Sequence, residues 1–162
     1  MPLFILVGLF FLHLGRRSID SLHIHYDTTV ACLEGLPIPA DLMVDCCPTE
    51  PVLQENTAAF VIGRTFVPSR SGPILVDAVQ VSPIPGNPQE PSYERHIPSF
   101  PVPVMIAQGT VASASSTNSC ATLSFPLAVS DYVRSSVKRS TVLSVLRQCA
   151  LLLHTQLICL TT

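Results

Sequence analysis

The sequence predicts a mainly β protein whose central part forms a small barrel or a curled antiparallel sheet. Apolar residues alternate with smaller or polar ones over residues 58–81 and again over residues 104–133, as in strands that bury one face. Turn-forming residues separate the strands within each stretch. Hydrophobic residues make up 48% of the 162 residues and charged residues only 12%, with a net charge of −2, which argues against intrinsic disorder.

Composition divides the chain into four segments. The first is apolar, the second is acidic and contains prolines, the third carries the strand-like alternation, and the fourth is rich in leucine. They span residues 1–17, 18–57, 58–140 and 141–162, and the third includes a proline-rich connection at residues 83–103. Residues 1–59 carry two basic and seven acidic residues, whereas residues 60–162 carry seven basic and four acidic ones. This asymmetry indicates segments of different character.

The N-terminal run at residues 2–14 is apolar throughout except for His13, and Gly15-Arg16-Arg17 follows it. As a helix the run would span about 20 Å, too short for the ~30 Å hydrocarbon core of a bilayer. Its length suits the core of a signal peptide, but no basic side chain precedes it and no A-x-A-like cleavage site follows. We therefore expect a strand or helix buried in the protein; the alternative is an export signal or a membrane anchor.

The first predicted hairpin follows an acidic loop or linker at residues 18–57. Residues 27–57 contain four of the fifteen prolines and show little periodicity. From Ala58 the pattern becomes strand-like, and Ile74 to Val81 is rich in β-branched residues. The turn residues Pro68-Ser69-Arg70-Ser71-Gly72 separate these two stretches, so we expect a hairpin here.

The proline-rich connection leads to a second predicted hairpin. Its spacing Pro85-x-x-Pro88-x-x-Pro91 is compatible with a polyproline II ligand, but we prefer a stiff, exposed connection. In the hairpin at residues 104–133, Gly109 permits a bulge or a sharp coil.

The C-terminal segment predicts an amphipathic helix over residues 141–162. Its leucine and valine residues recur at intervals of three and four residues. Polar residues such as Arg147 and His154 argue against a membrane-spanning helix. We expect the helix to pack on the β domain, and a helix that binds a protein partner would show the same pattern.

Two resemblances extend this prediction. The hairpin at residues 104–133 resembles the first hairpin of oligonucleotide-binding (OB) folds, in which a G-x-V strand, here Gly109-Thr110-Val111, meets a strand that ends near an acidic residue, here Asp131. This resemblance implies an OB-like barrel.

The second resemblance is to uncharacterised proteins of mushroom-type fungi. It is carried by Phe60-Val61-Ile62-Gly63-Arg64, by residues 79–86 and by Ser130-Asp131-Tyr132-Val133-Arg134. That group implies no activity and no site.

The motifs of common enzymes are missing from the sequence. It contains no G-x-S-x-G elbow, P-loop or G-x-G-x-x-G fingerprint. Its six cysteines form no C-x-x-C pair, which argues against a zinc ribbon or a thioredoxin-type motif. We therefore predict a protein that is not an enzyme and has no cofactor.

A weak metal candidate lies at His23-Ile24-His25-Tyr26-Asp27. On a strand, His23, His25 and Asp27 would share one face, and two imidazoles with a carboxylate can ligate a transition metal. A solvated strand face shows the same alternation, so we predict no metal site.

The function that the sequence favours is a non-enzymatic binding or interaction module, with single-stranded nucleic acid as the first candidate ligand. Stacking side chains and phosphate-binding cations would act together in such a site. The candidate residues are Phe125, Tyr132, Arg134, Lys138 and Arg139.

Two alternatives remain open: a secreted or membrane-tethered small β protein with a structural role, contacting the membrane through residues 2–14, and a partial chain without independent function. We expect an intracellular protein, with the secretory or membrane location as the alternative.

Overall fold

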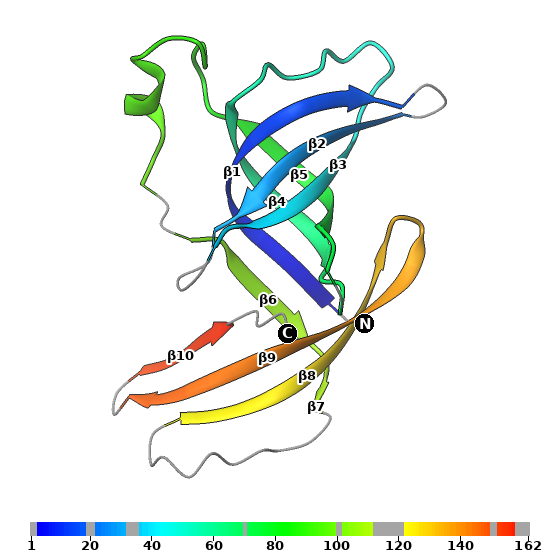
Figure 1. Ribbon diagram of the computed structural model, residues 1–162, viewed down its shortest axis with the longest axis vertical. Coiled ribbons are helices and arrows are strands. Elements are labelled where there is room, and N and C mark those ends of the chain that lie inside the picture. Colours follow the sequence, from blue (N-terminus) through cyan, green and yellow to red (C-terminus); the bar gives the residue numbers. More distant parts are fainter. Residues whose placement is uncertain are drawn as a thin grey trace.

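The computed structural model describes residues 3–18, 22–31, 36–69, 71–99, 102–111, 122–149 and 152–157. In this part of the chain, ten strands form two sheets and one short 3₁₀ helix is present, so the mainly β prediction is confirmed (Figure 1). The elements are β1 (Leu3–Arg17), β2 (His23–Val30), β3 (Ile38–Asp45), β4 (Thr57–Phe66), β5 (Ile74–Pro83), η1 (Tyr93–His96), β6 (Val104–Gln108), β7 (Thr110–Val111), β8 (Thr122–Val133), β9 (Ser136–Cys149) and β10 (Leu152–Leu157).

The first five strands close into a barrel. They follow the order β1–β2–β3–β5–β4, and β4 pairs with β1 to complete the circuit. The pairing of β3 with β5 is parallel, and the other four pairings are antiparallel. A small barrel is therefore present, but its five strands lie within residues 3–83 and not within residues 58–140, where the sequence pattern placed it.

The interior of the barrel is filled by alternate residues of each strand, as the two-residue period of β structure requires. In β1 these are the even-numbered residues from Phe4 to Leu12, of which Phe4, Leu6 and Leu12 are at most 1% exposed. Burial of each such side chain contributes about 1.5–3 kcal/mol. The buried residues of the barrel and two valines of the second sheet belong to one core cluster.

β1 is long because it pairs with three strands of its sheet, β6, β2 and β4. Its first half pairs with β6 from Leu3 to Val7, and its last residues pair with β2 after an irregularity between His13 and Arg16. On its other edge β1 pairs with β4. Residues 3–14 are thus part of a central barrel strand, the buried arrangement that we preferred for the apolar N-terminal run. In the part of the chain that the structure describes, no helix is long and apolar enough to cross a membrane.

The second sheet has the order β10–β9–β8–β7 and packs against the barrel (Figure 1). Val129 of β8 and Val142 of β9 are at most 2% exposed and join the core cluster of the barrel. Hydrogen bonds also link the barrel to the second sheet. Among them, the Phe4 amide donates to Asp131 Oδ2 at 2.9 Å, and the amide of Val67, just after β4, donates to Ser140 Oγ at 3.0 Å. The two sheets are therefore parts of one packed unit.

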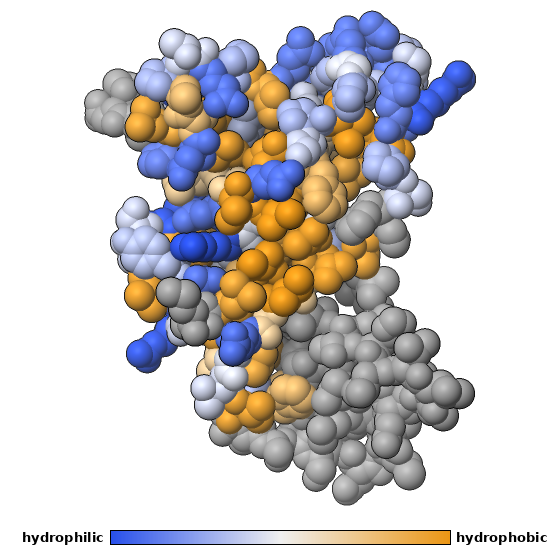
Figure 2. All heavy atoms as spheres, turned by 180° about the vertical axis from the view of Figure 1, so that it is seen from behind, coloured by the Kyte–Doolittle hydropathy of each residue, from blue (hydrophilic) through white to orange (hydrophobic). Residues whose placement is uncertain are grey.

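Gly109 lies where the chain passes from β6 in the first sheet to β7 in the second. A Cβ at this position would lie 2.2 Å from the carbonyl oxygen of Ala128 on β8. Only glycine permits this approach of two backbones. The strand β6 also presents Val104 and Ile106, both about half exposed. Hydrophobic residues form a band across the middle of the molecule when it is seen from behind (Figure 2).

The structure corrects further expectations. In the described residues of the predicted second hairpin at 104–133, β6 pairs with β1 of the first sheet, and only the short strand β7 pairs with β8. The predicted C-terminal amphipathic helix is wrong for the described residues of segment 141–162, which belong to β9 and β10. In β9, Ser140 and Val142 are buried whereas Arg139 and Thr141 are exposed, which is a two-residue period. The segment 18–57, expected to be a loop or linker, contains β2 and β3. Their outward acidic residues concealed the strand pattern in the sequence.

The first predicted hairpin is confirmed as β4 and β5, which pair antiparallel. The proline-rich connection at residues 83–103 contains η1 and seats Tyr93 against the barrel, at 4% exposure. The Tyr93 hydroxyl accepts a hydrogen bond from the Ala58 amide at 3.0 Å.

Candidate ligand-binding groove

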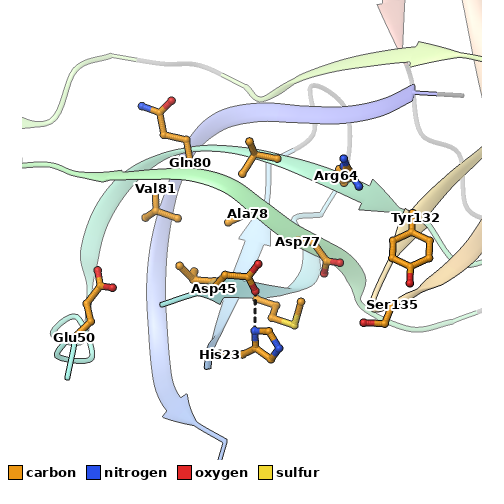
Figure 3. A pocket seen from close by; sticks show the side chains of 13 residues that line it. His23, Asp45, Glu50, Arg64, Asp77, Ala78, Gln80, Val81, Tyr132 and Ser135 are labelled. Atoms are coloured by element: carbon orange, nitrogen blue, oxygen red, sulfur yellow. Dashed lines mark ion pairs between the residues drawn. The ribbon is translucent and has the colours of Figure 1, made fainter. Parts of the chain in front are cut away.

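A groove of about 600 Å³ crosses the outer face of the barrel (Figure 3). β3 and β5 supply most of its wall, β2 and β4 contribute one residue each, and the β8–β9 turn closes one end. Glu50 lies at one end of the view, whereas Tyr132 and Ser135 lie at the other. The lining residues are His23, Met43, Val44, Asp45, Glu50, Arg64, Asp77, Ala78, Val79, Gln80, Val81, Tyr132 and Ser135.

The local strand pattern explains why these side chains face outward. On β3 the buried residues Ala40 and Leu42 alternate with Asp41, Met43 and Asp45, which therefore lie on the outer face. The parallel register places Met43 beside Asp77 of β5. The register of β4 with β5 shifts between Ile62 and Gly63, so the facing residues of β5 change from Gln80 to Ala78 and Val79 has no partner. This irregularity leaves Val79 68% exposed on the groove wall.

Acidic side chains outnumber basic ones among the lining residues. The carboxylates are Asp45, Glu50 and Asp77, against the guanidinium of Arg64. Asp45 Oδ1 lies 2.7 Å from His23 Nδ1, and the Asp45 side chain is still 75% exposed. The groove therefore offers carboxylate oxygens to a ligand in solvent.

The 46–50 segment that carries Glu50 is held by Arg17 at the end of β1. The Arg17 guanidinium donates to Cys46 Sγ at 3.2 Å and to the backbone carbonyls of Cys47 and Glu50. Tyr26 lies on the buried face of β2 at 2% exposure, and its hydroxyl accepts a hydrogen bond from the Leu53 amide at 2.9 Å. Burial raises the pKa of the Tyr26 hydroxyl above its ordinary value. Together these contacts hold residues 46–53 in place at one end of the groove.

The β8–β9 turn is attached to the other end through Arg134. Arg134 and Ser135 both have positive φ angles, 53° and 57°, as in a tight hairpin turn. The Arg134 amide donates to Asp77 Oδ2 at 2.6 Å, and Arg134 Nη2 lies 3.0 Å from Asp41 Oδ1 and donates to the Asp41 carbonyl at 2.9 Å. Arg134 Nε is 3.3 Å from Asp77 Oδ1. Two carboxylates of the barrel thus hold one guanidinium of the hairpin, whose side chain is 16% exposed.

The five residues predicted for nucleic-acid binding do not gather on one surface. Tyr132 lines the groove and is 52% exposed, but Arg134 is occupied by Asp41 and Asp77.

The other three lie further along the hairpin. Phe125 is half-buried in β8, and Lys138 Nζ lies 5.8 Å from the centre of the Phe66 ring. Arg139 is exposed on β9, beside Ser130 of β8. Only Tyr132 of the predicted set reaches the groove.

The metal candidates His23, His25 and Asp27 share the outer face of β2, as the alternation predicted. Each is paired separately: His23 with Asp45, His25 Nδ1 with Asp41 Oδ1 at 3.0 Å, and Asp27 Oδ1 with Arg16 Nη2 at 2.7 Å. Within the described residues, no group of three histidine, cysteine or acidic side chains is arranged to hold a metal ion.

Most residues that build the groove, above all Met43, Asp45 and Asp77, were not predicted from the sequence. The signal that could have found β3 is its alternation of Ala40, Leu42 and Val44 with polar or flexible neighbours. No protein-family model matches the chain, and no curated protein matches it either.

Proposed function

We propose that this chain is a non-enzymatic binding module built on an OB-type barrel, with its ligand in the groove across β3 and β5. OB barrels are five-stranded Greek-key barrels that bind ligands on the face of their second and third strands and in nearby loops. The supporting observation from the fold is the circuit β1–β2–β3–β5–β4–β1, with β3 parallel to β5, which is the strand order of that fold.

The observation that carries the proposal is that the groove overlaps this face along β3 and at His23 of β2. The outward residues of β3 lie in or beside the groove, and His23 of β2 lines it as well. Binding sites are commonly concave and combine apolar walls with a few polar groups. Here Val79, Val81 and Met43 supply the apolar wall, and Asp45 with Glu50 supplies the polar groups.

The test of this function is nuclear magnetic resonance mapping of candidate ligands on the ¹⁵N-labelled full chain. A ligand of the module should shift the amides of His23, Asp45 and Ala78. The variant Val79→Trp, which fills the groove from an exposed position, should weaken binding about tenfold, or about 1.4 kcal/mol. The matched variant Val104→Trp is at an exposed position on β6 outside the groove and should leave affinity unchanged. Shifts confined to residues outside the groove would refute the proposal.

Single-stranded nucleic acid is the second candidate ligand. The observation that favours it is the exposed ring of Tyr132 on the hairpin that also carries Lys138 and Arg139. Stacking on the ring and contacts with phosphates would then supply the affinity. Binding of fluorescent oligothymidylate should weaken as salt rises, and Tyr132→Ala with Arg139→Ala should abolish it. Binding that is independent of salt, or equal in the double variant, would exclude this candidate.

A further inference from the structure

We propose that the ligand of the groove is an extended, basic segment of a partner protein, whose arginine or lysine side chains pair with Asp45 and Glu50. The inference rests on the proposed binding function and names the class of ligand for the same groove. It depends on how the barrel face already binds a guanidinium, on the spacing of β3, and on the exposed carboxylates.

Arg134 shows how this face recognises a cation. Its guanidinium lies against the carboxylates of Asp41 and Asp77 and also donates to the Asp41 carbonyl. A planar guanidinium suits such a set of oxygens, because its donors point in several fixed directions. The hairpin turn therefore fills one cation site at the end of the groove.

The outward side chains of β3 recur at a regular spacing beyond that site. Asp41, Met43 and Asp45 face outward at every second residue, so their Cα atoms are separated by about 6.6 Å per step. Alternate side chains of an extended peptide have the same spacing. A peptide laid along β3 beyond Arg134 would therefore place one side chain over Met43 and the next beside Asp45. The thioether of Met43 and the wall formed by Val79 and Val81 suit the aliphatic stem of an arginine or lysine.

The carboxylates beyond Arg134 remain open to a ligand. Asp45 is paired with His23 but its side chain is 75% exposed, and Glu50 is exposed at the far end of the groove. Arg64, the guanidinium among the lining residues, lies beside Asp77 in the register of β4 and β5. The ligand-facing end of the groove is therefore negative. Phosphates would be repelled there, so the charge favours a basic peptide over nucleic acid.

The experiment measures fluorescence anisotropy of three labelled ten-residue probes with the full chain. They are an alternating arginine–serine peptide, an alternating glutamate–serine peptide, and oligothymidylate. We expect the arginine–serine peptide to bind and the glutamate–serine peptide not to bind. The double variant Asp45→Asn, Glu50→Gln should weaken the arginine–serine peptide at least tenfold, because two charge-assisted contacts are lost.

The matched control is Glu90→Gln, Glu94→Gln, which removes two exposed charges from the connection between β5 and β6 without touching the groove. It should change the affinity less than about twofold, which separates site recognition from net charge. Equal weakening by both double variants, or no binding of the arginine–serine peptide, would overturn the basic-peptide inference. Oligothymidylate that shifts groove amides while the peptide does not bind would leave the module intact and refute only this inference. No groove shift with any ligand would refute the module itself.

Discussion

Arg134 combines a strained turn conformation with the most connected ion pair that the structure describes on the barrel surface. Replacement by methionine keeps the aliphatic stem and the backbone φ but leaves Asp41 and Asp77 without their guanidinium. Because all three side chains are less than a third exposed, we expect a loss of about 2–3 kcal/mol in the free energy of unfolding. Chemical denaturation measures the change.

Arg139 supplies the control for this substitution, since it is exposed on the same hairpin and faces Ser130 rather than an acid. Arg139→Met should change stability by no more than about 0.5 kcal/mol. Adding Asp77→Asn to the Arg134→Met variant should recover part of the loss, because it removes one carboxylate that has lost its guanidinium partner. Equal destabilisation by the two methionine variants would show that the ion pairs of Arg134 do not stabilise the fold.

Glu55 gives the fold a pH dependence in the acid range. Hydrogen bonds from the Leu14 amide at 2.7 Å and from His13 at 3.1 Å lower the pKa of the Glu55 carboxyl below 4.5, the backbone contribution being the larger. A carboxyl whose pKa is lower in the folded state stabilises the fold above the unfolded-state pKa, and this stability is lost as pH falls through the folded-state pKa. The free energy of unfolding of the wild type should therefore exceed that of Glu55→Gln near about pH 5.5, and the difference should shrink toward about pH 3. A difference that stays constant over this range would contradict the assignment.

At the scale of elements, β9 shows why the C-terminal prediction was wrong. Its apolar residues satisfy the three- and four-residue spacing of a helix, but the structure buries Val142 at 1% exposure and leaves Val137 at 69%. Val142→Ala should therefore cost about 2 kcal/mol, whereas Val137→Ala on the same strand should stay within about 0.5 kcal/mol. Thermal or urea unfolding of the two variants measures both values. Similar losses would mean that β9 does not pack on the barrel through Val142.

The strands that could be predicted are those whose sequence pattern lies within a short stretch of the chain. β4 and β5 could be predicted because one turn joins them and each strand carries its own β-branched pattern. β2 and β3 could not, because Pro39, Asp41 and Asp45 resemble loop residues until their inward neighbours are known to be buried. The groove could not be predicted for the same reason, since Asp45 and Met43 in its wall belong to β3. Arg134, one of the cations predicted to bind nucleic acid, pairs within the chain with Asp41 and Asp77.

At the scale of the whole molecule, barrel closure could not be derived from local patterns. It depends on β1 pairing with β4 and on β3 pairing with β5, contacts between residues far apart in sequence. The apolar N-terminal run was visible in the sequence, but its place in the first sheet, with β4 on one edge and β2 and β6 on the other, was not. A strand with three different partners needs apolar residues along most of its length, and this explains why residues 3–14 resemble an export signal.

The continuity of the core predicts that the barrel and the second sheet unfold together. Val129 and Val142 belong to the core cluster of the barrel, and the contacts of Phe4 with Asp131 and of Arg134 with Asp77 cross between the sheets. Loss of either sheet would expose apolar surface and unpaired polar groups on the other, which couples their unfolding.

The chain contains no tryptophan, so one introduced indole reports on one sheet. Val79→Trp reports on the barrel and Val137→Trp on the second sheet, at positions that are 68% and 69% exposed and therefore perturb the core little. Their urea midpoints, followed by tryptophan fluorescence, should agree within about 0.3 M and coincide with the loss of far-ultraviolet circular dichroism, as two-state unfolding requires. A midpoint for Val137→Trp well below that for Val79→Trp would show that the second sheet detaches first. In that case the barrel would stay folded after the contacts of Arg134 with Asp41 and Asp77 are lost.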